Sequence, residues 1–301
     1  MPSFTNPAGI TLEYDTFGSP KGSPMLLVMG YTAQMTGWPV GFCRQLADAG
    51  HHVIRFDNRD CGLSTKHDGI AVDMDLILTA VMLNRPELVA GQVPYTLSHM
   101  ADDAWSVLDN LGIQRAHIVG ASMGGMIVQT MAIEHPERCL SLTSIMSMTG
   151  EVEYGQSSPE VQAALLAPSP TERDAYVQSA VDSWTIWMSK KYRDLDAIRA
   201  RAEESFDRSF YPEGAARQLG AIVASGSRAD GLRSLNVPTL VIHGLDDTLI
   251  TLSGGHRTAE LVPGARLEVI DDMGHDLPDP LWPALTRHIT SHAASSTVGA
   301  A

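Results

Sequence analysis

Gly120-Ala121-Ser122-Met123-Gly124 is the stretch that decides the fold, and it lies between an apolar run that predicts a strand and a segment with the pattern of a helix. A serine with glycine two positions before and after it is typical of a sharp strand-to-helix turn, which places the hydroxyl at the top of a sheet. Side chains at the two glycine positions would collide in that turn, and the serine takes a strained backbone conformation. The pattern therefore predicts that Ser122 is a nucleophile. The alternative, a glycine-rich turn with a capping serine, is disfavoured by the flanking strand and helix.

A serine hydroxyl is a weak nucleophile at neutral pH and needs a base, commonly a histidine oriented by a carboxylate. After such a turn the chain order is serine, acid, histidine. Asp246 and Asp247 follow a buried predicted strand, and His275 follows the last one, so both segments end at the same edge of a parallel sheet. We predict that His275 is the base and Asp247 the acid. Asp247 is preferred to Asp246 because the acid usually lies three residues after the glycine, here Gly244.

Two backbone N–H groups are predicted to bind the oxyanion that forms during acyl transfer. The first belongs to Met123, at the start of a helix. The second is expected in the loop after an early strand, which here reads Met29-Gly30-Tyr31-Thr32, and the donor would be the Tyr31 N–H. The Tyr31 side chain could contact substrate or pack over the serine turn, and the sequence leaves both open.

Strands and helices alternate up to about residue 150, which predicts a mostly parallel sheet with right-handed crossovers. Residues 151–232 show helical patterns only, and they are predicted to form a helical cap inserted into an α/β core of residues 1–150 and 233–293. Residues 294–301 are small and polar and are predicted to be disordered. The predicted strands are Ile10–Phe17, Met25–Met29, His52–Phe56, His117–Gly120, Leu142–Ser147, Pro238–His243 and Arg266–Ile270. The predicted helices outside the cap are Trp38–Ala49, Tyr95–Leu111, Met123–Glu134, His256–Val262 and Trp282–Ala293.

The charge of the chain limits its partners. Acidic residues number 35 against 21 basic ones, which gives a formal net charge of −14. This balance argues against a nucleic-acid binder and against adsorption to anionic lipid, since both need a basic face. The three cysteines show no C-x-x-C spacing and fit free thiols in a reducing compartment. His243 and Asp247 lack a third ligand nearby, so no metal site is predicted.

The N-terminal nine residues lack a basic region followed by an apolar run, and no stretch is long and apolar enough for a bilayer span. We therefore expect a cytoplasmic protein without a transmembrane segment; peripheral association with an envelope and the oligomeric state stay open. Two segments are candidate walls of a substrate site: Val72–Val93 and Ser183–Met188, the latter with Trp184, Trp187 and Met188. Their large apolar side chains favour a lipophilic substrate, or they pack the cap against the core.

These segments together resemble the α/β-hydrolase superfamily, and the resemblance covers residues 10–293. The run from Asp57 to Ser64 is similar to the D-x-R-G-x-G-x-S loop of that superfamily, but it has Asp60 where glycine is usual. The resemblance implies an eight-stranded, mostly parallel sheet with flanking helices and an inserted helical cap. It also implies ester hydrolysis without a metal or organic cofactor, with Ser122, Asp247 and His275 as the catalytic triad.

Four segments are more closely similar to the aclacinomycin methylesterases and to actinobacterial lipase/esterase relatives: residues 28–30 (VMG), 37–39 (GWP), 55–65 (RFDNRDCGLST) and 119–129 (VGASMGGMIVQ). The resemblance implies a carboxylic ester hydrolase that takes small lipophilic esters, methyl esters included. A thioesterase or phospholipase-like lipase with the same triad, a cofactor-free perhydrolase (haloperoxidase-like), and a non-catalytic ligand-binding protein are the alternatives. Epoxide and haloalkane hydrolysis are disfavoured, because those relatives carry aspartate where Ser122 stands.

Overall fold

The fold is a sheet of eight strands in the order β1-β2-β4-β3-β5-β6-β7-β8, seen in a computed structural model that describes residues 2–298. Strands β3 to β8 run parallel, while β1 and β2 pair antiparallel at one edge. The predicted eight-stranded, mostly parallel sheet is therefore confirmed. The strands are β1 Ser3–Thr5, β2 Thr11–Phe17, β3 Ser23–Val28, β4 His51–Phe56, β5 Ala116–Ala121, β6 Cys139–Ile145, β7 Thr239–Gly244 and β8 Arg266–Ile270.

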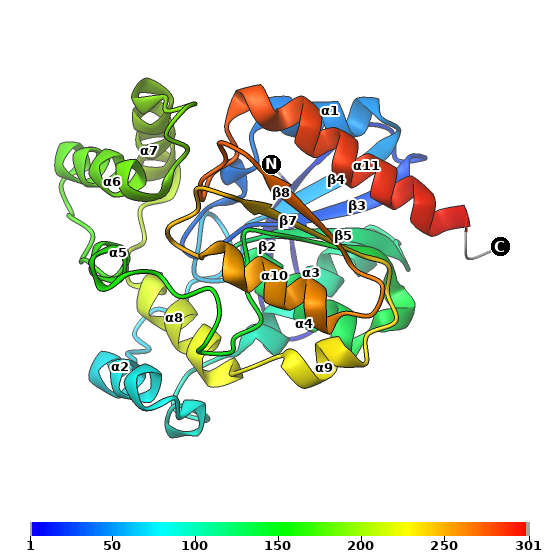
Figure 1. Cartoon of the computed structure of the whole chain (residues 1–301). Coiled ribbons are helices and arrows are strands. Elements are labelled where there is room, and N and C mark those ends of the chain that lie inside the picture. Colours follow the sequence, from blue (N-terminus) through cyan, green and yellow to red (C-terminus); the bar gives the residue numbers. More distant parts are fainter. Residues whose placement is uncertain (1, 299–301) are drawn as a thin grey trace.

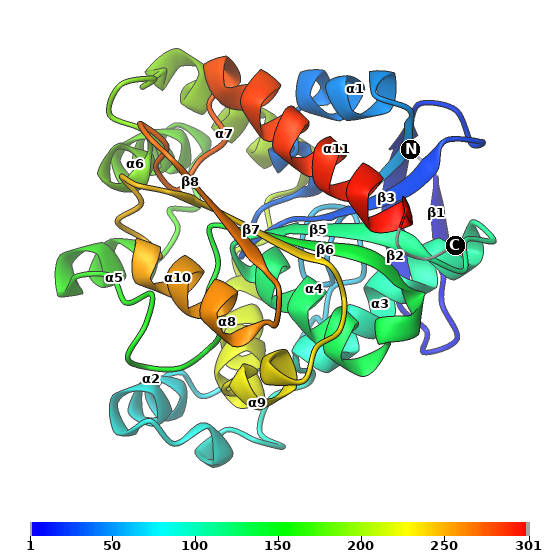
Figure 2. The same ribbon diagram turned by 45° about the vertical axis from the view of Figure 1, so that its right-hand side comes forward.

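Helices cover both faces of the sheet, because its central strands are apolar on both sides. In β3, Met25 and Leu27 contribute to one buried cluster, and Leu26 and Val28 contribute to the other. Helices α1 and α11 pack on the first face and α3, α4 and α10 on the second (Figure 1, Figure 2). Their bounds are α1 Val40–Asp48, α3 Leu97–Asn110, α4 Met123–Glu134, α10 Leu252–Leu261 and α11 Trp282–Val298.

Five helices lie between β6 and β7, where the sequence predicts helical structure only. Helices α6 and α7 pack against each other and, with α5, stand at one end of the sheet (Figure 1). Helix α8 instead contacts α2 and α3, and α9 contacts α4 and α10, so these two lie against the rest of the fold. We retain the cap boundaries at residues 151 and 232 as a proposal. The bounds are α2 Met74–Leu83, α5 Pro159–Leu165, α6 Arg173–Trp187, α7 Leu195–Ser209, α8 Gly214–Ser225 and α9 Ala229–Arg233.

The C-terminal segment corrects one prediction. Helix α11 continues to Val298, so the disorder predicted from residue 294 onward is wrong for residues 294–298; residues 299–301 lie outside the described part of the chain. Small alanine and serine side chains are compatible with a helix, and the Ser295 and Ser296 hydroxyls donate to the His292 carbonyl. Helix α10 also begins earlier than predicted, at Leu252, and strand β1 was not predicted.

Among residues 2–298, no helix combines the length and the hydropathy that a bilayer crossing requires.

Candidate active site

The turn between β5 and α4 has the geometry that the glycine pattern predicts. Ser122 follows β5 directly and has φ 57° and ψ −122°, a combination that side-chain-bearing residues rarely adopt. Its backbone is fixed from β6 and the loop beyond it: the Ser122 N–H donates to the Ile145 carbonyl at 2.9 Å, and the Ser147 hydroxyl donates to the Ser122 carbonyl at 2.8 Å. Helix α4 begins at Met123, so the strained residue sits where strand becomes helix.

The two glycines of the turn are required by close backbone contacts. A Cβ at Gly120 would overlap the carbonyl of Gly124, and a Cβ at Gly124 would overlap the carbonyl of Val28 in β3. The predicted collision is therefore real, but the two positions meet different neighbours. Gly120 makes room for the first turn of α4, while Gly124 lets that turn approach the neighbouring strand.

Asp247 and His275 form a buried acid–base pair at the same edge of the sheet. The His275 Nδ1 lies 2.7 Å from Asp247 Oδ2, and both residues are nearly inaccessible to solvent. The other carboxylate oxygen, Oδ1, accepts from the N–H groups of Leu249 at 2.9 Å and Ile250 at 3.0 Å, which fixes its rotamer. Asp246, the rival acid, is partly exposed and forms no hydrogen bond or ion pair with His275 within residues 2–298.

His243 lies beside this pair and is buried, but it has another role. Its Nε2 lies 2.8 Å from the Ile250 carbonyl, which identifies Nε2 as the protonated nitrogen. Burial lowers the pKa of His243, so the ring is neutral and the 3.6 Å approach to Asp247 is no ion pair. No group of three or more His, Cys, Asp or Glu side chains in the described chain is arranged to hold a metal ion.

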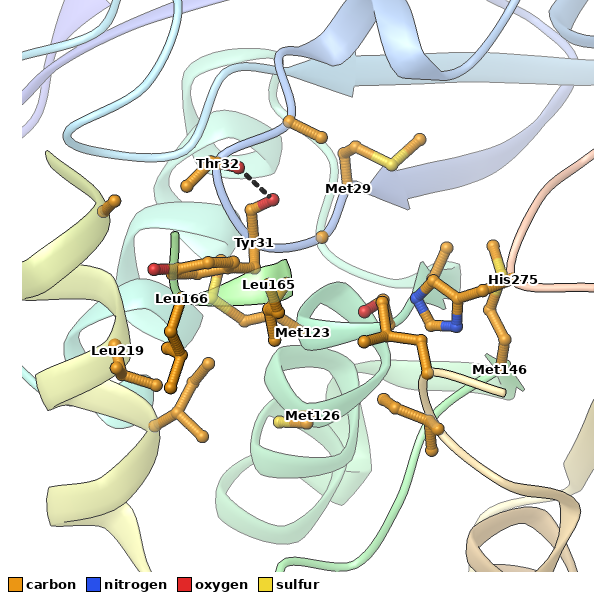
Figure 3. Close-up of a pocket in the computed structure, with 18 of the residues that line it drawn as sticks. Met29, Tyr31, Thr32, Met123, Met126, Met146, Leu165, Leu166, Leu219 and His275 are labelled. Atoms are coloured by element: carbon orange, nitrogen blue, oxygen red, sulfur yellow. Dashed lines mark hydrogen bonds between the residues drawn. The ribbon is translucent and has the colours of Figure 1, made fainter. Parts of the chain in front are cut away.

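The loop after β3, which the sequence predicts to carry the second oxyanion donor (residues 29–32, called the oxyanion loop below), lies against the serine turn. A Cβ at Gly30 would lie 2.9 Å from the Ser122 Cβ and 3.4 Å from its Oγ, so only glycine fits there. The backbone N–H groups of Tyr31 and Met123 donate to no acceptor within residues 2–298 and are available to a ligand. Figure 3 shows Tyr31, Met123 and His275 around one space.

The last residue of α6 and the segment after it support the loop that carries His275, called the histidine loop below. The His275 backbone N–H donates to the Trp187 carbonyl at 2.7 Å, and a Cβ at Gly274 would overlap that same carbonyl. The N–H groups of Ser189 and Gly274 donate to Asp276 Oδ1 at 3.1 and 3.2 Å. Burial raises the pKa of Asp276, a residue that sequence reasoning did not single out because no motif includes it.

A cavity of about 1090 Å³ lies between these loops and the inserted helices. Trp184 and Trp187, two of the candidate wall residues, line it, whereas Met188 packs against Val181 of α6 and Ile198 of α7 and is absent from the described cavity wall. Helix α2, within the predicted wall segment 72–93, contributes through Leu78, Val81 and Met82. Six methionines line the cavity, which makes the wall adaptable as well as apolar: Met29, Met82, Met123, Met126, Met146 and Met148.

Two buried aspartates of the 57–64 loop bind arginines of the inserted helices, a feature that the sequence did not reveal. Asp57 Oδ2 accepts from Arg208 Nη2 of α7 at 2.7 Å. Asp60, the departure from the glycine of the superfamily loop, accepts from Arg217 of α8 through Nε at 2.8 Å and Nη2 at 3.0 Å. The Tyr95 hydroxyl also donates to Asp60, at 2.7 Å.

The charge of Asp60 is well compensated. Burial by itself raises the pKa of a carboxyl group, but the hydrogen bonds from Arg217, the His67 N–H and the Tyr95 hydroxyl outweigh it and hold the pKa of Asp60 below its usual value. The ion pair is bidentate and buried, so it fixes the orientation of α8 as well as holding the helix close to Asp60.

The sheet has eight mostly parallel strands, and at one edge it carries a strained serine turn and a buried carboxylate–imidazole pair. Together these features define the class of α/β hydrolases. The chain belongs to the alpha/beta hydrolase fold family, whose model matches residues 23–279.

Relatives cover almost the whole chain. It is 28% identical to the rhodomycin D methylesterase DauP of Streptomyces sp. (strain C5) and 29% identical to the rhodomycin D methylesterase DnrP of Streptomyces peucetius. Each match covers 96% of this chain and 97% of the relative. The similarity to methylesterases that the sequence indicates is confirmed. Among solved structures, the meta-cleavage product hydrolase CumD of Pseudomonas fluorescens IP01 superposes with a TM-score of 0.76 at 20% identity, covering 98% of both chains, which supports the fold.

Proposed function

We propose that the chain hydrolyses carboxylic esters of bulky, lipophilic acids, methyl esters included, through an acyl-enzyme on Ser122. The observation that carries the proposal is the arrangement around the cavity: Ser122 on a strained turn, His275 held by Asp247, and two unpaired N–H groups beside the serine. The 28–29% identity to methylesterases over 96% of the chain supports the same reaction class.

The tautomer of His275 suits it to be the base. Because Asp247 accepts the hydrogen bond from the Nδ1–H group, the Nε2 lone pair stays available to take the Ser122 proton. The Ser122 oxygen then bonds to the acyl carbon, and the N–H groups of Tyr31 and Met123 stabilise the negative oxygen. His275 returns the proton to the departing alcohol, which is methanol for a methyl ester. It next deprotonates a water that releases the acid and regenerates Ser122.

The size and lining of the cavity support a large acyl group rather than a small one. Its volume lies slightly above the about 300–1,000 Å³ usual for small-molecule sites, and methionine, tryptophan and leucine side chains contribute to its wall. A polycyclic or long-chain acid would bury its apolar surface there, while the small alcohol would leave from the part of the cavity that Ser122 and His275 line.

A panel of p-nitrophenyl esters, aromatic methyl esters and acyl-CoA thioesters tests the proposal. We expect hydrolysis of lipophilic esters, and a loss of about 10⁴–10⁶-fold in kcat for Ser122→Ala. Hydrolysis by Ser122→Ala at near the wild-type rate would contradict the assignment. The same panel separates the alternatives: faster turnover of acyl-CoA supports a thioesterase, peroxide-dependent halogenation in acetate supports a perhydrolase, and binding without turnover supports a ligand-binding protein.

A further inference from the structure

We propose that Gln218 of α8 is a positioning residue that holds the oxyanion loop. An inserted helix would thereby determine the position of the Tyr31 N–H, the donor on which turnover depends. The inference rests on the proposed function and names a residue outside the serine, acid and histidine. It concerns the loop on which the Tyr31 N–H lies, which follows β3 and belongs to no strand or helix.

Gln218 is completely buried and uses both ends of its amide. Its Oε1 accepts from the Thr32 N–H at 2.8 Å, and its Nε2 donates to the Arg59 carbonyl at 2.9 Å. One side chain therefore links the oxyanion loop to the loop after β4. A buried amide is costly unless it is hydrogen-bonded, so this geometry is strongly preferred over any other rotamer of Gln218.

The residue that Gln218 holds is strained. Thr32 has φ 57°, a left-handed conformation that is unfavourable for a β-branched residue, so its surroundings must impose it. The peptide between Tyr31 and Thr32 is bonded on both sides: its N–H donates to Gln218, and its carbonyl accepts from the Thr32 hydroxyl at 2.7 Å (Figure 3). Fixing this peptide fixes the chain direction at Tyr31, whose own N–H is the proposed oxyanion donor.

Helix α8 is itself placed firmly enough to act as the support. Arg217, the residue before Gln218, makes the bidentate ion pair with Asp60. Gly214, at the start of α8, packs so closely on the Asp60 carbonyl that a Cβ would overlap it. Loss of the Gln218 bonds should therefore free the loop while leaving the helix in place.

The test uses the full-length protein and the best p-nitrophenyl ester from the panel. Gln218→Met removes both bonds at nearly constant volume, and we expect kcat to fall about 10- to 100-fold with KM within about threefold, because an oxyanion donor acts mainly in the transition state. Affinity for a trifluoromethyl ketone, which forms a tetrahedral adduct, should fall in parallel. Affinity for the product acid should not change.

Two further variants separate positioning from general destabilisation. Gln218→Glu keeps an acceptor for the Thr32 N–H and should recover part of kcat. Ser225→Ala, on the same helix, removes the hydroxyl that accepts from the Leu97 N–H at 2.9 Å and should leave kcat unchanged. If Gln218→Met does not fold, Gln218→Asn, which is too short to reach both partners, should show the same loss of kcat at unchanged KM.

Wild-type kcat in Gln218→Met and Gln218→Asn would overturn the inference. It would also be overturned if Gln218→Met lost affinity for the ketone and for the product acid alike and Gln218→Glu recovered no kcat. A wild-type protein that hydrolyses no ester overturns the proposed function, and this inference with it. The two failures are thus distinguishable.

Discussion

The serine turn and the oxyanion loop flank the same hydroxyl but are supported by different parts of the molecule. The turn is held by the sheet: β6 fixes the Ser122 N–H, and β3 packs against Gly124. The oxyanion loop is held by Gln218, which lies 186 residues away from Thr32 in the chain. The histidine loop resembles the oxyanion loop, since its N–H at His275 donates to Trp187 of the inserted segment. The core thus fixes Ser122, the proposed nucleophile, while the inserted helices add hydrogen bonds to the loops that carry Tyr31 and His275.

After Ser122→Ala, the largest expected loss of turnover among changes in the core comes from Asp247→Asn. An amide at this position no longer holds the His275 tautomer, and the expected fall in kcat is about 10⁴-fold. Asp246→Asn is the matched control, because within residues 2–298 the Asp246 side chain forms no hydrogen bond or ion pair with His275, and we expect its kcat to stay within about threefold of wild type. Equal losses in both variants would show that the acid has been assigned wrongly.

Gly124→Ala tests the serine turn, which the sheet supports. The new Cβ would overlap the Val28 carbonyl, so the first turn of α4 must shift and carry the Met123 N–H with it. We expect kcat to fall about 10²–10³-fold, the usual effect of losing one oxyanion donor, with correct folding checked by circular dichroism. Wild-type turnover in this variant would refute a rigid, sheet-supported turn.

Arg217→Met tests the anchoring of α8, the inserted helix that supports the oxyanion loop. Removing one member of a buried ion pair leaves Asp60 without its main partner, and the free energy of unfolding should fall by about 3 kcal/mol. Turnover should fall less than in Gln218→Met, because α8 loses an anchor but keeps its bond to the oxyanion loop. Arg173→Met, which removes an exposed pair with Asp207 between α6 and α7, should change stability little. Similar stability losses in both would contradict a special role for the Asp60 anchor.

The smallest expected effect on turnover concerns the strand that carries the serine. Burial, with His51 and His292 nearby, lowers the pKa of His117 to about 4, against about 6.5 in an unfolded chain. The unfolded chain therefore takes up a proton first as the pH falls. The contribution of His117 to stability is complete above pH 6.5 and is lost between pH 6.5 and 4, by at most about 1.4 kcal/mol per pH unit.

His117→Asn should make the free energy of unfolding less dependent on pH over this range, and it should leave kcat at pH 7.5 unchanged. Chemical denaturation at several pH values measures the slope. An unchanged slope would mean that the buried ring at position 117 does not govern acid sensitivity.

The difference between the serine turn and the other loops also decides which of their features the sequence could predict. The serine turn was predictable because its requirements are local: two glycines, a strand before and a helix after. The hydrogen bonds that support the other loops could not be predicted, because Gln218 and Arg217 lie in a helical insertion. They are more than 150 residues away in the sequence from their partners Thr32 and Asp60. Asp60 was recognised only as a departure from a family pattern, since nothing in its neighbourhood indicates an arginine on another helix. Met188 was misplaced for the same reason: apolar residues in a helical run do not reveal which of them face the cavity.

The assignment of Ser122 is tested most directly by the site of reaction with a fluorophosphonate, located by mass spectrometry of the digested protein. We expect a single adduct on Ser122, formed much more slowly in Asp247→Asn and not at all in Ser122→Ala. An adduct on another serine, or none on a wild-type protein that hydrolyses esters, would contradict it.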